Sequence, residues 1–275
     1  MTVQITDCVL FKPALSRPKA VPVQGASNSA FTVSWACSAA EVREAQRLRY
    51  LVFAHEMGAQ LETLPGMAEP IDADRFDPYC DHLLVRAAAS GHGRGQVIGT
   101  YRVLGPRAAR RAGGLYAETE FDLAPLASLR ARAVELGRSC VHPAWRTGGV
   151  IMALWTALGQ YMITHELETM IGCASISLSD GGDTARRLWQ RLGRTHLAER
   201  CWQVEPYVPL ALLDQDVAGP ATAIVIPPLI KGYLRCGAQL LGPPALDTAF
   251  NTADLPMMMR IGDLAPRYYK HFLAH

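Results

Sequence analysis

The feature that most constrains the fold of this 275-residue chain is a strand, a helix and a second strand in direct succession near its middle. Residues 133–141 and 170–176 are short apolar runs typical of buried strands, and residues 150–165 carry apolar side chains at helical spacing. Two parallel strands need a crossover connection, which is usually a helix. This succession therefore predicts an α/β fold with a mixed sheet, in which the two strands are parallel neighbours.

The residues before this unit predict an irregular arm followed by a helix. Residues 1–33 contain several prolines and a cluster of Ser, Gly and Asn, which indicates a segment without regular structure. Ser38 followed by Glu41 is a capping-box pattern, and Gly58 is a typical helix end, so a helix is predicted between them. Residues 62–79 are rich in proline and acidic residues and are predicted to be a loop.

A hairpin and two further helices complete the prediction. Residues 82–89 and 96–104 indicate two strands joined by a glycine-rich turn. Helices are also expected at two later segments, 184–192 and 229–236. We therefore predict one domain over residues 34–275, with a mixed central sheet flanked by helices and a C-terminal extension from about residue 226.

Composition excludes several classes of protein. Lys and Arg number 27 against 25 Asp and Glu, so the net charge of +2 gives no electrostatic footprint for nucleic acid. No apolar run approaches the length of about 18 residues that a membrane-spanning helix needs. The seven cysteines are scattered without a Cys-x-x-Cys pair, which argues against a disulfide framework or a zinc site. We expect a cytoplasmic protein with no metal and no nucleic-acid partner; a peripheral position at the inner face of the membrane stays open.

Glycines and an arginine stand at the entrance of the 150–165 helix. Gly148 and Gly149 let a ligand oxygen approach exposed backbone N–H groups, where the helix dipole favours an anion. Arg146 adds a positive charge at the same place. The group predicts a phosphate contact, although glycines before helices are also common without one.

The same segment resembles the pyrophosphate loop, Gln/Arg-x-x-Gly-x-Gly/Ala, of the GCN5-related N-acetyltransferase (GNAT) superfamily. Arg146 and Gly149 match this loop, and Ile151 replaces its final small residue. The resemblance implies a GNAT fold without a tightly bound cofactor and with an acyl-phosphopantetheine thioester as co-substrate, carried by acyl carrier protein or by coenzyme A. The residues expected to contact this donor are Ser139, Cys140, Val141, Arg146, Gly148 and Gly149.

A second series of residues is similar to the acyl-homoserine-lactone (autoinducer) synthases. In that family an Arg and a Phe on the first helix, two acidic residues, a strand Arg and a later Glu…Arg pair surround the acyl-transfer site. The matching residues are Arg49, Phe53, Asp74, Asp77, Arg102, Phe121, Glu135 and Arg138. The chain departs from that family at Met57-Gly58, where the synthases usually have a Trp.

Longer motifs resemble the ornithine N-acyltransferases. These motifs are Phe76-Asp-Pro-Tyr-Cys-Asp-His82, Ile98-Gly-Thr-Tyr-Arg102, Leu136-Gly-Arg-Ser-Cys-Val-His142, Pro227-Pro-Leu-Ile-Lys-Gly-Tyr233 and Asp247-Thr-Ala-Phe-Asn-Thr-Ala-Asp254. The resemblance implies transfer of a 3-hydroxyacyl group from acyl carrier protein to the α-amine of L-ornithine, giving lyso-ornithine lipid. Two alternatives stay open. One is a synthase of acyl-homoserine lactones or of other N-acyl amino acids, such as N-acylglycine; the other is a lipid-interacting effector, because such proteins are sometimes labelled hemolysin-like.

The resemblance assigns the amino-acid substrate to charged side chains. Arg49 and Arg102 are expected to bind its carboxylate, for which a guanidinium offers paired N–H donors. Asp74 and Asp77 are candidates for binding its ammonium group, although an acidic loop is more often simply solvated.

The chemistry needs a neutral amine and a stabilised oxyanion. Glu135 is the candidate base, and the alternative is a structural ion pair with Arg138 or Arg102. His82 is a candidate proton shuttle or else a structural residue. We expect Cys140 to be a core residue rather than a nucleophile. The backbone N–H groups of residues 139–141 would meet the oxyanion.

The acyl chain needs an apolar tunnel, and a carrier protein needs a basic surface. Tunnel candidates are Met152, Trp155, Met162 and the run Met257-Met258-Met259, although such residues are more often ordinary core. Candidates for docking an acidic carrier protein are Arg107, Arg110, Arg111, Arg186, Arg187 and Arg191, unless these form a solvated face.

Overall fold

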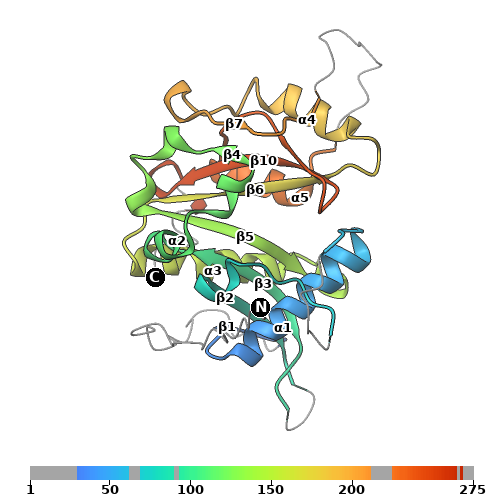
Figure 1. Ribbon diagram of the computed structural model, residues 1–275. Coiled ribbons are helices and arrows are strands. Elements are labelled where there is room, and N and C mark those ends of the chain that lie inside the picture. The colour runs from blue at the N-terminus through green and yellow to red at the C-terminus, as the bar shows by residue number, and fades with distance from the viewer. Residues whose placement is uncertain (1–29, 62–68, 90–92, 212–224, 265–266, 269–275) are drawn as a thin grey trace, which may run out of the picture.

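The computed structural model describes residues 30–61, 69–89, 93–211, 225–264 and 267–268, so most of the predicted irregular arm lies outside the described residues. Its centre is an eight-stranded mixed sheet in the order β1-β2-β3-β5-β6-β10-β8, with β9 paired to β10 (Figure 1). The strands are β1 (Phe31–Trp35), β2 (Asp81–Ala87), β3 (Val97–Leu104), β5 (Ala133–Val141), β6 (Thr169–Ser177), β8 (Gln239–Leu240), β9 (Ala245–Asp247) and β10 (Thr252–Arg260). Two short strands, β4 (Phe121–Asp122) and β7 (Glu205–Pro206), pair separately.

Helices cover both faces of this sheet. They are α1 (Ala39–Tyr50), continued as a π-helical turn over Leu51–Glu56, α2 (Pro106–Ala112), α3 (Gly149–Thr164), α4 (Asp183–Leu192) and α5 (Pro228–Cys236). None of the helices in the described ranges combines the length and apolarity needed to span a bilayer.

The predicted crossover is confirmed. β5 and β6 pair in parallel and are joined by α3, whereas the other strand pairs of the sheet are antiparallel. The predicted start of α1 is confirmed as well. The Ser38 hydroxyl accepts a hydrogen bond from the Glu41 N–H at 3.3 Å, and the Glu41 carboxylate accepts one from the Cys37 N–H at 2.7 Å.

Two segments differ from the prediction. The predicted irregular arm ends too late, because β1 begins at Phe31 and pairs with β2. β10 was not assigned as a strand, although it lies between β6 and the short strands β8 and β9. Pro256 lies within this strand, and proline lacks the N–H that a ladder hydrogen bond needs. A proline in a sequence therefore argues against a central strand at that place.

Alternation along the strands gives the sheet two distinct faces. Leu83, Tyr101 and Val134 pack with Leu154 and Leu158 of α3, and we call this side the α3 face. On the opposite side, Leu84 packs against α1, and this side is the α1 face. Residues one apart in a strand therefore contribute to different surfaces.

Candidate active site

β5 and β6 separate soon after they begin. Their parallel pairing covers only three residue pairs, from Ala133–Thr169 to Glu135–Ile171. Gly172 follows the last pair, and a Cβ there would stand 2.3 Å from the Leu136 carbonyl oxygen, so only glycine permits this approach. Beyond it the two strands diverge, as Figure 1 shows. The split thus lies between the two strands that the sequence predicts to be parallel neighbours.

A cavity of about 660 Å³ occupies the split and is lined by residues from both faces of the sheet. Its walls include the free edge of β5, from Gly137 to Val141. The α1 face contributes mostly polar and aromatic residues: Phe53, Arg102, Tyr116, Glu135, Arg138, Asp247, Phe250 and Asp254. The α3 face contributes mostly apolar and aromatic residues: Tyr101, Leu136, Ile151, Trp155 and Tyr233. One cavity thus joins a polar and an apolar compartment.

The residues predicted to bind the acyl donor gather at this split. Ser139, Cys140, Val141, Arg146 and Gly148 line the cavity, and Gly149 is the first residue of α3. Gly148 has a left-handed conformation (φ 97°) that caps the helix. Their role in donor binding stays a prediction.

Arg146 is fixed at the cavity edge. Its Nε donates a hydrogen bond to the Val141 carbonyl at 3.0 Å, and its guanidinium forms a bidentate pair with Glu56. The hydrogen bonds from Arg146 lower the pKa of Glu56. A phosphate at this helix entrance would therefore compete with Glu56 for the guanidinium.

Cys140 is buried, and burial raises the pKa of its thiol to about 12. A thiol held in its neutral form is a poor nucleophile, which favours direct attack by the amine on the thioester.

A β-bulge turns Arg138 toward the α1 face. The register between β3 and β5 shifts between Thr100 and Arg102, and Arg138 adopts a left-handed conformation (φ 51°) that is uncommon for a residue other than glycine. Its guanidinium lies 4.7 Å from the centroid of the Tyr116 ring and 4.4 Å from that of Phe250. The bulge thus places a cation between two aromatic rings in the cavity wall.

Beneath this wall, three arginines and three aspartates alternate in a closed ring. The order is Arg49–Asp72–Arg138–Asp74–Arg102–Asp77 and back to Arg49. Every nitrogen–oxygen distance around the ring lies between 2.6 and 3.3 Å. We call it the Arg–Asp ring; formal charges within it cancel.

Burial opposes ionisation in this ring, and pairing overcomes it. Burial raises the pKa of Asp77, but Arg49 and Arg102 outweigh burial and hold this pKa well below its usual value. Burial also raises the pKa of Asp74, but Arg102 outweighs burial, so this pKa is lowered as well. Both groups are therefore carboxylates that are committed to guanidinium partners.

The ring corrects part of the predicted substrate contacts. Arg49 is completely buried and, with Asp74 and Asp77, is not among the residues that line the cavity. Arg49 pairs with Asp72 and Asp77, and Asp74 pairs with Arg102 and Arg138, so these side chains are engaged within the ring. Arg102 and Arg138, in contrast, do line the cavity. Sequence reasoning missed Asp72, although it stands in the same acidic loop.

Glu135 binds backbone amides. Its two carboxylate oxygens accept hydrogen bonds from the N–H groups of Tyr116 and Ala117, each at 2.7 Å, so it caps the 3-10 turn Tyr116–Thr119. Burial raises the pKa of Glu135, and the two amides oppose that rise. The expected alternative, an ion pair with Arg138 or Arg102, is replaced by this contact; the role as base stays a prediction.

His82 lies outside the cavity lining. Its Nε2 contacts the Asp77 carbonyl oxygen at 3.1 Å, and burial lowers its pKa, so the imidazole is neutral. This position fits the structural alternative better than a proton shuttle.

The two predicted phenylalanines differ in position. Phe53 lines the cavity and meets the edge of Phe250 at a centroid distance of 5.9 Å. Phe121 was expected in a loop, but it lies in β4 and is fully buried in the core of the α1 face. A direct contact between Phe121 and a substrate is therefore not supported by its position.

Sequence reasoning assigned no role to a group of acidic side chains beside Arg138. Asp254 is buried in β10 and Asp247 ends β9, and both line the cavity; Glu120 lies next to them. Burial raises the pKa of Glu120 to about 9, with Asp254 and Asp247 adding to the rise. Burial also raises the pKa of Asp254 to about 6. We call these three residues the acidic cluster.

Two members of the acidic cluster belong to the one potential metal-ligand group found in the described ranges. Ligand atoms of Glu120, Cys173 and Asp254 lie within 4.8 Å of one another. Burial raises the pKa of Cys173 well above its usual value, so it is a neutral thiol rather than the thiolate that binds metals.

The predicted tunnel residues separate into two sets. Trp155 lines the main cavity, and the run Met257–Met259 lines a smaller adjoining pocket. Met162 is a core residue under α3, and neither it nor Met152 is among the lining residues.

The basic candidates for carrier docking lie on two helices that are well apart in Figure 1. Arg107, Arg110 and Arg111 belong to α2, and Arg186, Arg187 and Arg191 belong to α4. They do not form one continuous patch, and their role in docking stays a prediction.

Comparison with known proteins agrees with this geometry. Residues 48–156 match the model of the acetyltransferase (GNAT) domain. The chain is 36% identical over 255 residues to L-ornithine N(alpha)-acyltransferase of Brucella abortus, covering 88% of each chain. It is also 36% identical to L-ornithine N(alpha)-acyltransferase of Rhizobium meliloti, over 86% of this chain and 82% of the relative.

Among solved structures, FeeM, an N-acyl amino acid synthase from uncultured soil microbes, has a similar fold. Its TM-score is 0.51 at 10% identity, over 87% of this chain and 96% of that chain. The fold, the split sheet and the extended identity to these relatives lead to one conclusion: the chain is an acyltransferase with a GNAT fold and belongs to the L-ornithine N(alpha)-acyltransferase family.

Proposed function

We propose that this protein transfers a 3-hydroxyacyl group from the phosphopantetheine thioester of acyl carrier protein to the α-amine of L-ornithine, giving lyso-ornithine lipid. Support comes from the names of its relatives and from one observation above all. The split between β5 and β6 joins a polar compartment to an apolar one. The polar compartment contains cations together with carboxyl groups that form no ion pair among the described residues.

The polar compartment suits a diamino acid. The guanidinium groups of Arg102 and Arg138 can attract the carboxylate of ornithine, although both are already engaged in the Arg–Asp ring. The acidic cluster can bind its side-chain ammonium, which would supply the missing positive charge and lower the raised pKa values of Glu120 and Asp254. Glycine has no such ammonium, so this cluster favours ornithine over glycine as acceptor.

The donor would enter the split along the free edge of β5. Backbone N–H groups of residues 139–141 would stabilise the oxyanion, and the entrance of α3 with Arg146 would meet the phosphate. The neutral α-amine forms a C–N bond to the thioester carbon, and the tetrahedral intermediate then breaks its C–S bond. One proton leaves the nitrogen and the departing thiolate takes up one; Glu135 stays the candidate base for the first transfer.

The test is an acylation assay with purified protein. Matched 3-hydroxyacyl thioesters of acyl carrier protein and of coenzyme A are offered with ornithine, lysine, glycine or S-adenosylmethionine, and the products are identified by mass spectrometry. We expect an Nα-acylornithine, formed faster from the carrier protein. A lactone product would indicate the signalling alternative, and no amide with any amine would refute the proposal.

A further inference from the structure

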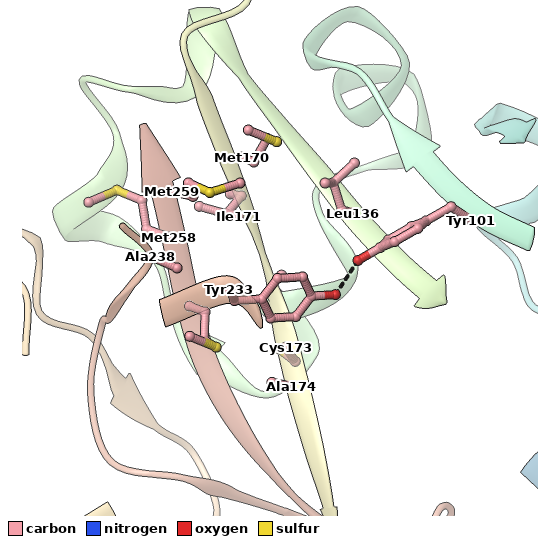
Figure 2. A pocket seen from close by; sticks show the side chains of 12 residues that line it. Tyr101, Leu136, Met170, Ile171, Cys173, Ala174, Tyr233, Ala238, Met258 and Met259 are labelled. Atoms are coloured by element: carbon pink, nitrogen blue, oxygen red, sulfur yellow. Dashed lines mark hydrogen bonds between the residues drawn. The ribbon is translucent and has the colours of Figure 1, made fainter. Parts of the chain in front are cut away.

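Two tyrosines meet at the point where the main cavity narrows on the α3 face. Tyr101 comes from β3 and Tyr233 from α5, and their hydroxyl groups are hydrogen-bonded to each other. Figure 2 shows the two rings pointing toward one another across the space between β5 and β6. Tyr101, Tyr233 and Leu136 line the main cavity and also two small pockets, of about 50 and 40 Å³, that continue from it.

Apart from the Ser139 side chain, which hydrogen-bonds to Tyr101, the surroundings of this hydroxyl pair are apolar. The small pockets are lined by side chains such as Met170, Met257, Met259, Leu158 and Leu264. Trp155 stacks on the Tyr233 ring at a centroid distance of 5.5 Å, and a Cβ on Gly232 would lie 2.4 Å from Trp155, so the helix packs closely here. The tyrosine pair is therefore a fixed polar point on an otherwise apolar path.

The tyrosine pair lies next to the part of β5 where the thioester is expected. Tyr101 stands opposite the bulge of β5, between the register pairs Thr100–Cys140 and Arg102–Gly137. The Ser139 side chain is close enough to oppose the rise in the pKa of Tyr101 that burial causes. Because the thioester carbonyl is expected at residues 139–141, the next carbons of the acyl chain would pass the two hydroxyl groups.

We propose that Tyr101 and Tyr233 select acyl donors that carry a hydroxyl group on the third carbon; this inference rests on the proposed function. Each phenol can donate one hydrogen bond and accept others. The bond between them uses one proton, and the Ser139 side chain is a further hydrogen-bond partner of Tyr101. The second phenolic proton and the remaining acceptor capacity of the pair can then serve a ligand. A 3-hydroxyl group can accept and donate at once, a 3-oxo group can only accept, and an unsubstituted chain does neither.

The experiment compares three donors of equal length: 3-hydroxyacyl, 3-oxoacyl and unsubstituted acyl-pantetheine thioesters, with ornithine in excess. We expect kcat/KM to be highest for the 3-hydroxyacyl donor, at least about tenfold above the unsubstituted one, with the 3-oxo donor between them. Tyr101→Phe and Tyr233→Phe keep the rings. Each should bring the ratio of kcat/KM for the 3-hydroxyacyl donor to that for the unsubstituted donor close to one, mainly by slowing use of the hydroxylated donor. Tyr161→Phe is the matched control, since its hydroxyl binds Asp81 at 2.8 Å outside these pockets, and it should leave the ratio unchanged.

Binding of stable thioether analogues is measured in parallel by calorimetry, so that the preference is read without turnover. If no amide forms, the proposed function fails, but the ratio of analogue affinities still decides this inference. A wild-type protein without preference for the hydroxylated donor would overturn it. So would Phe variants that slow all three donors equally, because that result indicates a role in the chemistry rather than in selection.

Discussion

The Arg–Asp ring and the acidic cluster are both buried charge groups on the α1 face, yet they are built in opposite ways. In the ring every carboxylate has two guanidinium neighbours, and pairing lowers the pKa values of Asp74 and Asp77. In the acidic cluster, within the described ranges, no ion pair involves Glu120, Asp247 or Asp254, and burial raises the pKa values of Glu120 and Asp254. Fully paired charges hold a wall in place, whereas unpaired charges beside a cavity can receive a ligand.

The largest effect is expected from breaking the ring. Arg49→Met leaves Asp72 and Asp77 buried without their shared partner, so the free energy of unfolding should fall by about 3–5 kcal/mol. Urea denaturation followed by circular dichroism measures this loss. Arg132→Met is the control, because its ion pair with Glu168 is exposed and should contribute little. Equal small losses in both variants would show that the ring is not structural.

Removing a charge from the acidic cluster should affect binding instead of folding. Asp254→Asn is expected to lower kcat/KM for ornithine about 10- to 100-fold, because a charge-assisted hydrogen bond to the side-chain ammonium is lost. Steady-state kinetics should show little change in the KM of the acyl donor or in glycine acylation. Glu205→Gln, on the exposed strand β7, serves as control. A uniform loss with both amino acids would contradict a role in recognising the ornithine side chain.

The two groups should also respond to pH with opposite signs. The lowered pKa values of the ring carboxyls contribute stability above about pH 4, which is lost as the pH falls further. The raised pKa values of the acidic cluster contribute stability at low pH, which is lost as the pH rises through about 6 for Asp254 and then about 9 for Glu120.

Melting temperatures between pH 5 and 10 test this difference. The wild-type Tm should decline toward alkaline pH, and the decline should be smaller in the double variant Glu120→Gln/Asp254→Asn. Added ornithine should raise the wild-type Tm more at pH 8 than at pH 5, because Asp254 is ionised at pH 8 and the ornithine ammonium compensates its charge. Parallel pH curves for the wild type and the double variant would refute the assignment.

A smaller loss of stability than in Arg49→Met is expected at Glu135. Glu135→Gln keeps one amide-accepting oxygen of the two, so it should cost about 1–2 kcal/mol in unfolding free energy. If Glu135 is also the base, kcat should fall more than donor affinity does. Unchanged turnover together with lower stability would leave Glu135 only as the cap of the Tyr116–Thr119 turn.

Much of the scaffold could be predicted from the sequence because local patterns determine it. The succession of β5, α3 and β6 and the Ser38 cap depend on periodicity and nearby side chains. β10 could not be assigned in this way, since Pro256 contradicts the local rule while pairing with β6 overrides it.

The site was predictable only in part. Except for Asp72, the Arg and Asp residues of the ring were found by resemblance. That likeness does not distinguish a residue that lines a cavity from one behind it, as Arg49 illustrates. Glu120 and Asp254 are far apart in the chain and meet only through the fold. The motif from Asp247 to Asp254 was a signal for the acidic cluster, although nothing local indicated its chemistry.

The most direct test of the account is a crystal structure of the protein with its expected product, Nα-(3-hydroxyacyl)ornithine. The account predicts that the amide lies in the split between β5 and β6, with the ornithine side chain at Asp254 and Glu120 and the 3-hydroxyl group at Tyr101 and Tyr233. A product with both ends on the same face of the sheet, or bound outside this split, would contradict it.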